Sequence, residues 1–251
     1  MTPTTPASQA LSFDTAAALY AANRPSYPPA LFDAVEELAG RALAGARVAD
    51  VGAGTGLATA RLVEHGARVV AVEPGAGMAA EFRRALPGVP LVLGDGNRLP
   101  LASGSADFVT YAQSWHWTDP QRSVPEALRV LRPGGALALW WNDSDVTVPW
   151  IADQDARVRG LFGVDVRETD PLVRFRRLTT ELDFGTRQVA WSRSVPLDRH
   201  LANLASHSAF LMLGEQGTAE FLAAERALLT AVFPDGTVEE RYVVSLGVAR
   251  R

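Results

Sequence analysis

Short apolar runs alternate with longer amphipathic stretches through the first half of the chain. The apolar runs cover residues 46–51, 68–72, 90–93, 108–112 and 136–141. The stretches with apolar residues at helical spacing cover residues 56–65, residues 76–86 and the segment after Thr118. Short apolar runs predict buried strands, and the stretches between them predict helices. Such alternation is typical of a parallel sheet with helices on both faces, so we expect an α/β fold with a doubly wound sheet.

The pattern continues more loosely in the second half of the chain. The expected elements are a helix at 150–162, a sixth strand at 186–192, helices at 197–213 and 218–233, and a last strand at 242–249. Together with the five earlier runs, these strands predict a seven-stranded, mostly parallel sheet. His200 and His207 fall on one face of an expected helix, where we expect a helix surface rather than a zinc site, because no partner ligands accompany them.

The composition excludes several classes of protein. Of the 251 residues, 47% are apolar and 21% are charged, as in soluble globular proteins, and no run reaches the ~18 apolar residues of a membrane span. Residues 1–13 are polar and Pro-rich, which predicts a disordered lead-in without a secretion signal, and hence a cytoplasmic protein. The absence of cysteine excludes disulfides and thiolate nucleophiles, and the net charge of −4 argues against nucleic acid as a partner. We expect a monomer or homodimer that acts on a small molecule away from membranes.

A glycine-rich turn follows the first strand, and its spacing is typical of a ligand-binding loop. Residues 50–56 are Asp-x-Gly-x-Gly-x-Gly, directly before a helix, so the turn exposes backbone N–H groups and a helix N-terminus to a ligand. Glu73 ends the second strand, 19 residues after Gly54, where a carboxylate can accept both hydroxyls of an adenosine ribose. Leu57 stands where a dinucleotide fingerprint requires glycine. We therefore expect a site for adenosine without a pyrophosphate.

This arrangement of the glycine turn and Glu73 resembles the S-adenosylmethionine site of class I methyltransferases. The turn Gly94-Asp95-Gly96-Asn97 after the third strand and the turn Leu131-Arg-Pro-Gly-Gly135 before the fifth carry the same resemblance. It implies a Rossmann-like fold, with S-adenosyl-L-methionine as cofactor and S-adenosyl-L-homocysteine as product. The implied cofactor-binding residues are Asp50, Gly52, Ala53, Gly54, Gly56, Glu73, Pro74, Met78, Asp95, Gly96, Asn97, Gln113 and Ser114.

The N-terminal segment adds a second resemblance. Between helices expected at 14–22 and from Ala30 to about Leu43, the run Tyr20…Arg24-Pro25-x-Tyr27-Pro28 is similar to the start of a methyltransferase branch that includes the trans-aconitate methyltransferases. In that branch the segment is a lid over the cofactor. The implied plan is a lead-in at 1–13 and a single methyltransferase domain at 14–251. The parts of this domain are the lid and first helices at 14–45, the cofactor-binding core at 46–145, and the C-terminal strands at 146–251 with a helical cap at about 195–235.

The fourth strand ends in Gln113-Ser-Trp-His-Trp117, which places aromatic rings and an imidazole at the expected catalytic edge. Aromatic faces attract a sulfonium cation, and the ordinary pKa of histidine suits a general base near neutral pH. His116 is therefore a candidate base with Tyr20 as a second catalytic residue, although His116 could instead orient the loop. The expected substrate pocket comprises Tyr20, Arg24, Tyr27, Trp115, His116, Trp117, Trp141 and Phe210. Core packing explains Tyr27 and Phe210 equally well.

The sequence thus predicts methyl transfer to a small-molecule acceptor, an aromatic or apolar compound of secondary metabolism, at an O, N or C atom. The aromatic strip favours such an acceptor over a citrate-like acid, for which Arg24 is the only evident partner. A carboxyl methyltransferase of a small organic acid stays an alternative, as do a nicotinamide-dependent oxidoreductase and a protein that holds the cofactor without turnover. We expect no metal, because Gln113 stands where catechol-type enzymes carry an acidic ligand.

Overall fold

A seven-stranded sheet runs through the chain, of which the computed structural model describes residues 23–163, 175 and 182–251. The strand order is β3-β2-β1-β4-β5-β7-β6. The strands are β1 (Arg47–Val51), β2 (Arg68–Glu73), β3 (Leu91–Leu93), β4 (Ala106–Ala112), β5 (Leu131–Ser144), β6 (Gly185–Pro196) and β7 (Thr237–Arg250). The strands from β3 to β5 pair in parallel, and β7 runs antiparallel between β5 and β6. The expected mostly parallel sheet of seven strands is confirmed.

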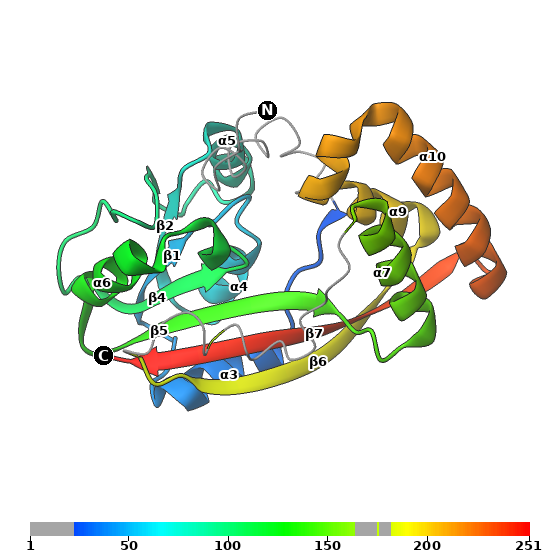
Figure 1. Ribbon diagram of the computed structural model, residues 1–251. Helices are drawn as coiled ribbons and strands as arrows, with labels where there is room; N and C mark the ends of the chain where they lie inside the picture. The colour runs from blue at the N-terminus through cyan, green and yellow to red at the C-terminus, as the bar shows by residue number, and fades with distance from the viewer. Residues whose placement is uncertain (1–22, 164–174, 176–181) are drawn as a thin grey trace.

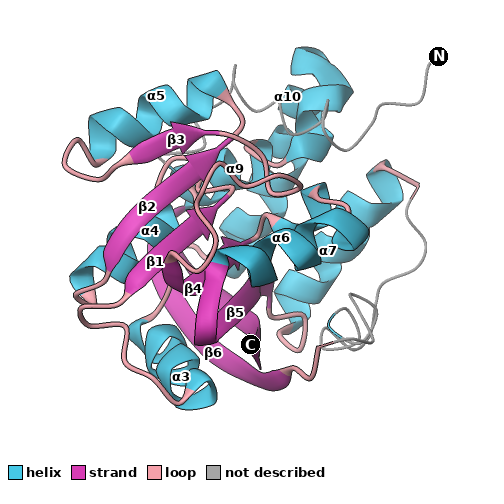
Figure 2. Ribbon diagram, turned by 90° about the vertical axis from the view of Figure 1, so that its left-hand side faces the viewer, coloured by secondary structure: helices cyan, strands magenta, loops and turns pink. Residues whose placement is uncertain are grey.

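Helices cover both faces of the parallel part of this sheet (Figure 2). On one side lie α3 (Pro29–Ala39), α4 (Leu57–Glu64) and α5 (Ala76–Ala85), and on the other lies α6 (Pro120–Val130). Successive side chains of a strand point to opposite faces of the sheet, so neighbouring residues of β5 pack against different layers of helices. The Trp140 ring meets Phe32 of α3 edge-to-face at 6.1 Å, whereas the Trp141 ring meets Phe175 on the other face at 5.4 Å.

The three strands at the antiparallel side are longer than the sequence predicts. β5 and β7 have 14 residues each and β6 has 12, and their far ends leave the parallel core and carry α7 (Pro149–Leu161), α9 (Leu197–Ala205) and α10 (Ser208–Val232) (Figure 1). β6 is an edge strand with mostly exposed side chains, so the apolar pattern marks only part of it. The first helix expected in the cap, 197–213, is divided between α9 and the start of α10, and α10 itself is interrupted at Gly214, whose backbone (φ +81°, ψ 169°) is not helical.

The cap holds a buried polar network in addition to its own small apolar core. Glu240 of β7 accepts hydrogen bonds from Nδ1 of His200 (2.7 Å) and from the Tyr242 hydroxyl (2.8 Å), and it pairs with Arg193 of β6. Burial would raise the pKa of Glu240, but the His200 and Arg193 contacts outweigh it and lower the pKa to about 2. His200 is 6% exposed, so the expected helix-surface position is wrong: the α9 face that carries it packs onto β7.

Candidate active site

The glycine turn lies at the carboxyl end of β1, where the order of the strands reverses between β1 and β4. Gly52, Gly54 and Gly56 all have positive φ, which favours glycine. A Cβ on Gly52 would meet the Ser114 side chain at 2.4 Å, and one on Gly56 would meet Leu86 at 2.7 Å. Apart from its chain neighbours, no atom of the described residues would lie within 4 Å of a Cβ on Gly54, so this Cβ would extend into open space. The outer two glycines are thus required by packing, whereas Gly54 leaves room for a ligand.

Glu73 ends β2 beside this turn and is directly bonded to it. Its carboxylate accepts the backbone N–H of Gly54 and that of Gly75, each at 2.8 Å. These two bonds fix the carboxylate at the edge of the open space beside Gly54.

Asp50 lies beneath the turn and supports it from inside. Its carboxyl group is fully buried and accepts hydrogen bonds from the hydroxyls of Thr59 (2.6 Å) and Thr110 (2.9 Å). Burial raises the pKa of Asp50 to about 6, although the two hydroxyl bonds act in the opposite direction. Because both oxygens face α4 and β4, Asp50 shapes the loop from below and does not present its carboxylate to the open space at Gly54.

The turn after β3 forms the third part of this edge. Asp95 is exposed, and its carboxylate accepts the N–H of Asn97 at 2.6 Å, as in an Asx-turn. The side chain of Asn97 in turn accepts the N–H of Asp119, the N-cap residue of α6, at 2.8 Å. Gly96 is buried, where a Cβ would meet Thr118 at 2.9 Å. The remaining expected cofactor residues lie around the turns after β1 and β2: Ala53 and Met78 are buried, and Pro74 is exposed.

The end of β4 carries a backbone conformation that is uncommon outside glycine. Gln113 has φ +58°, and it is the one non-glycine residue with positive φ among those the structure describes. Its side-chain nitrogen donates to the carbonyl of Asn142 on β5 at 3.3 Å, and the hydroxyl of Ser114 donates to the carbonyl of Val51 at 2.6 Å. Residues in sparsely populated backbone regions gather at functional sites. Gln113 lies where the expected catalytic loop begins.

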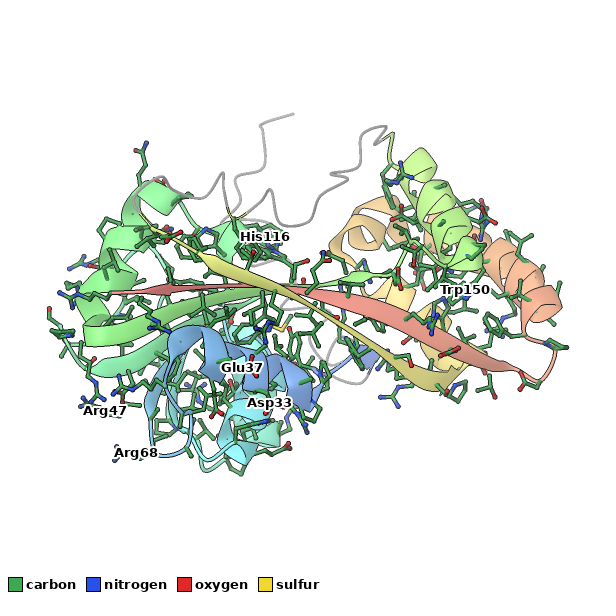
Figure 3. The ribbon with its side chains drawn as sticks, turned by 90° about the horizontal axis from the view of Figure 1, so that it is seen from below. Asp33, Glu37, Arg47, Arg68, His116 and Trp150 are labelled. Carbon is green, nitrogen blue, oxygen red and sulfur yellow. The ribbon has the colours of Figure 1, made fainter. Side chains whose placement is uncertain are left out.

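His116 is exposed and lies on the face of the sheet opposite α3, which carries Asp33 and Glu37 (Figure 3). The indole N–H of Trp141 donates to Nδ1 of His116 at 3.2 Å. The centroid of the His116 ring lies 4.6 Å from that of the Trp117 ring. An indole nitrogen only donates, so Nδ1 must be the acceptor, and the neutral imidazole carries its hydrogen on Nε2. In this tautomer Nε2 is a hydrogen-bond donor and has no lone pair with which to remove a proton from an acceptor.

The structure separates the other expected pocket residues. Trp115 is 1% exposed and its ring meets Tyr111 edge-to-face at 4.7 Å, because residues 115–117 form a 3-10 turn that directs successive side chains to different sides. Trp115 therefore lies in the core, not in a pocket wall. Tyr27 is 8% exposed and packs against Trp140, so it follows the core-packing alternative.

Two more of the expected pocket residues lie at the cap: Arg24 contacts it, and Phe210 belongs to it. Nη1 of Arg24 lies 3.1 Å from Nε2 of His207, and its Nη2 donates to the carbonyl of Ser206 at 3.3 Å. Burial and the neighbouring Arg24 charge lower the pKa of His207 to about 3, so this ring is neutral. Phe210 is buried between Phe162 and Phe221, each with its centroid at 5.4 Å. Tyr20 lies outside the described residues.

Sequence reasoning missed Asn142, near the carboxyl end of β5, and Trp191 of β6. Oδ1 of Asn142 accepts the indole N–H of Trp191 at 2.9 Å. Trp191 in turn stacks on Tyr242, with the two ring centroids 5.1 Å apart. The two members of the hydrogen bond lie 49 residues apart in the chain, so no local motif could have paired them.

A separate cavity of about 610 Å³ lies at the opposite end of the strands, lined by Val48, Val69, Pro90 and Leu101 among others. Arg47 and Arg68 line it as well, and Figure 3 shows both on the side of the molecule away from the cap residue Trp150. Within the described part of the chain, no three His, Asp or Glu side chains gather as a metal site would require. Nor does any described helix have the length and apolar character needed to cross a membrane.

Known proteins resemble this chain in both sequence and structure. The family described as "Methyltransferase domain" matches residues 49–139. An uncharacterized methyltransferase of Mycobacterium tuberculosis is 40% identical over 222 residues, which cover 87% of this chain and 86% of the relative. A demethylmenaquinone methyltransferase of Beutenbergia cavernae is 43% identical over 96 residues, 38% of this chain and 40% of that protein. Among solved structures, a proposed type II methyltransferase of Anaeromyxobacter dehalogenans has a TM-score of 0.66 and 27% identity, and the match covers 90% of this chain and 97% of that one.

Proposed function

This chain belongs to the class I S-adenosylmethionine-dependent methyltransferases, and on that premise we propose that it methylates a small aromatic or apolar acceptor. The cofactor supplies, when bound, a methyl group on a sulfonium that is already activated for in-line attack. The chain therefore has to position the acceptor and exclude water, and orientation of this kind is worth up to about 7–11 kcal/mol. The expected cofactor contacts around Gly54, Glu73 and Asp95 are part of the same proposal.

The observation that carries the choice of acceptor is the aromatic character of the strand ends. Trp117 follows β4 and Trp141 lies near the end of β5, the strand beside β4, so two large rings lie near the ends of neighbouring strands. Ring faces stabilise both a sulfonium and an aromatic acceptor. The relative from Beutenbergia cavernae is named for demethylmenaquinone, and an acceptor of related ring chemistry would suit these side chains.

The arginines of this region support the same choice. Arg24 already contacts Ser206 and His207, and Arg193 pairs with Glu240 and donates to the carbonyl of Asn23 at 3.1 Å. A triacid acceptor would need cations that face the pocket, because a buried carboxylate without a partner is costly. An uncharged acceptor needs none. The carboxyl methyltransferase alternative is therefore the weaker of the two.

For His116 we propose the role of a hydrogen-bond donor to the acceptor, not that of a general base. Trp141 occupies Nδ1 as a donor, and Nε2 therefore carries a proton and cannot take another. The Nε2–H group can hold an acceptor oxygen in line with the methyl group. Tyr20 remains proposed from the sequence as a second residue of this kind.

The wider setting is proposed from the sequence. The protein would be a cytoplasmic monomer or homodimer. It would bind no nucleic acid, which accords with the net charge of −4. The N-terminal residues 14–45 would close over the cofactor, and the cap at about 195–235 would close over the acceptor.

Calorimetric titration with S-adenosylhomocysteine tests the cofactor, with NADH as the control ligand. We expect binding of the first and none of the second. A labelled methyl donor then tests acceptors on a panel of naphthols, phenols and small tricarboxylates, and we expect transfer to ring compounds. Failure to bind S-adenosylhomocysteine would contradict the cofactor assignment, and preferential transfer to a tricarboxylate would contradict the acceptor class.

A further inference from the structure

The side-chain amide of Asn142 is a buried donor without a partner at the carboxyl end of β5. The residue is 9% exposed, and no acceptor lies within hydrogen-bond distance of its Nδ2 among the described residues. Most buried polar groups in native proteins are paired, because leaving one unpaired costs the free energy of its lost hydration. Asn142 therefore requires an explanation.

The orientation of this amide is fixed by chemistry. Trp191 donates through its indole N–H, which cannot accept, so the atom that it meets at 2.9 Å must be Oδ1. Nδ2 is consequently the other atom of the carboxamide. Trp191 is itself held in place, since it stacks on Tyr242 at an interplanar angle of 24° and Tyr242 donates to the buried Glu240.

The amide lies at the carboxyl end of β5, the same edge of the sheet as the glycine turn after β1. Trp191 lies on the edge strand β6, which β7 separates from β5, and it takes up Oδ1. The nitrogen leaves the same carbon in a diverging direction, away from the Trp191 indole. From the neighbouring strand end, Gln113, with its positive φ, donates to the main-chain carbonyl of Asn142.

We propose that Nδ2 of Asn142 donates a hydrogen bond to an uncharged oxygen of the methyl acceptor and so fixes the acceptor beside the cofactor. This inference rests on the proposed function and deepens it, because it requires the aromatic acceptor to carry a hydroxyl or carbonyl group. An uncharged amide suits an uncharged oxygen, and Arg24 and Arg193 are already committed to other partners. A buried donor discriminates strongly against an analogue that lacks the oxygen, because it then stays unpaired.

A matched pair of probes tests the proposal on the full chain saturated with S-adenosylhomocysteine. 1-Naphthol and 1-methylnaphthalene differ only by a hydroxyl in place of a methyl group, and quenching of tryptophan fluorescence reports their binding. We expect the wild type to prefer 1-naphthol by about tenfold. Asn142→Leu has a side chain of similar size and loses the donor, so it should bind the two probes equally. Affinity for S-adenosylhomocysteine should be unchanged in this variant.

Trp191→Phe serves as a second, independent variant. It keeps a ring against Tyr242 and leaves Asn142 in place without its anchor, so we expect a reduced but measurable preference for 1-naphthol. The role of Asn142 would be overturned if Asn142→Leu kept the preference for 1-naphthol, or if the wild type bound neither probe or both equally. Each of these outcomes would leave the cofactor assignment intact. A wild type that fails to bind S-adenosylhomocysteine would overturn the proposed function and this inference with it.

Discussion

The indole nitrogen of Trp141 donates a hydrogen bond to Nδ1 of His116 over 3.2 Å, between the end of β5 and the turn after β4. This contact decides which imidazole nitrogen bears the hydrogen, and so whether His116 can donate or accept. The adjacent Trp140 points to the opposite face and packs against Tyr27 and Phe32. Two consecutive tryptophans thus serve different ends: Trp140 fills the core, and Trp141 sets the tautomer of a candidate active-site histidine.

Replacement of Trp141 by phenylalanine should release the tautomer of His116. Phenylalanine retains a ring against Phe175 but has no N–H, so neutral His116 can then carry its hydrogen on either nitrogen. In ¹⁵N-detected NMR, we expect a single Nε2–H form in the wild type and a mixture in the variant. A wild-type spectrum dominated by the Nδ1–H form would contradict the donor role and restore the base as the better hypothesis.

Gly54→Ala should weaken cofactor binding far more than it destabilises the fold. The added methyl group extends into the open space beside Glu73, and the positive φ costs about 1–2 kcal/mol for a residue with a Cβ. Gly104→Ala is a matched control, since Gly104 has φ +62° and equally open space on the exposed turn before β4. Denaturant unfolding should show similar losses for both variants, whereas titration with S-adenosylhomocysteine should show a loss for Gly54→Ala only. Equal affinities in the two variants would contradict the position of the site.

Glu73→Gln should weaken binding of S-adenosylhomocysteine by about 1.5–3 kcal/mol, the usual range for hydrogen bonds to a charged group. The variant keeps one oxygen but turns the other acceptor into a donor, which opposes the N–H of Gly54 or Gly75. Glu126→Gln provides the control, because Glu126 also accepts a backbone N–H, from Leu99 at 2.8 Å, but lies on α6. If calorimetry gave wild-type affinity for Glu73→Gln, the ribose assignment would be wrong.

The features that were predicted correctly are local in sequence. The glycine turn and Glu73 lie within 24 residues, and their strands pair directly, so spacing alone places them together. Trp115 was misplaced because a 3-10 turn, not an extended strand end, follows β4, and the pattern of residues does not distinguish the two. Asn142 and Trp191 depend on the pairing of β5, β7 and β6, which brings residues far apart in the chain into contact. The sequence thus predicted the contact between Glu73 and the glycine turn, but not the contact that the pairing of β5, β7 and β6 creates.

Two buried carboxyl groups should give the stability of this protein opposite dependences on pH. The pKa of Asp50 is raised by burial from 3.8 to about 6, so the folded state holds more protons than the unfolded state between these values. The stabilisation of the fold that Asp50 contributes is fully present below about pH 4 and is lost as the pH rises through 6. The pKa of Glu240 is lowered from 4.5 to about 2, so its contribution is present above pH 4.5 and is lost as the pH falls toward 2. Each shift corresponds to about 3 kcal/mol across its window.

The variants Asp50→Asn and Glu240→Gln separate these two contributions. Urea unfolding between pH 3 and 7 should show Asp50→Asn gaining on the wild type as the pH rises from 4 to 6, because the amide stays uncharged next to Thr59 and Thr110. Glu240→Gln should fall behind the wild type as the pH rises from 3 to 5, because it no longer attracts Arg193. Parallel dependences of the free energy of unfolding on pH between pH 4 and 6, in Asp50→Asn and the wild type, would show that Asp50 ionises in the folded state as readily as in water. The hypothesis that burial keeps Asp50 protonated beneath the glycine turn would then be wrong.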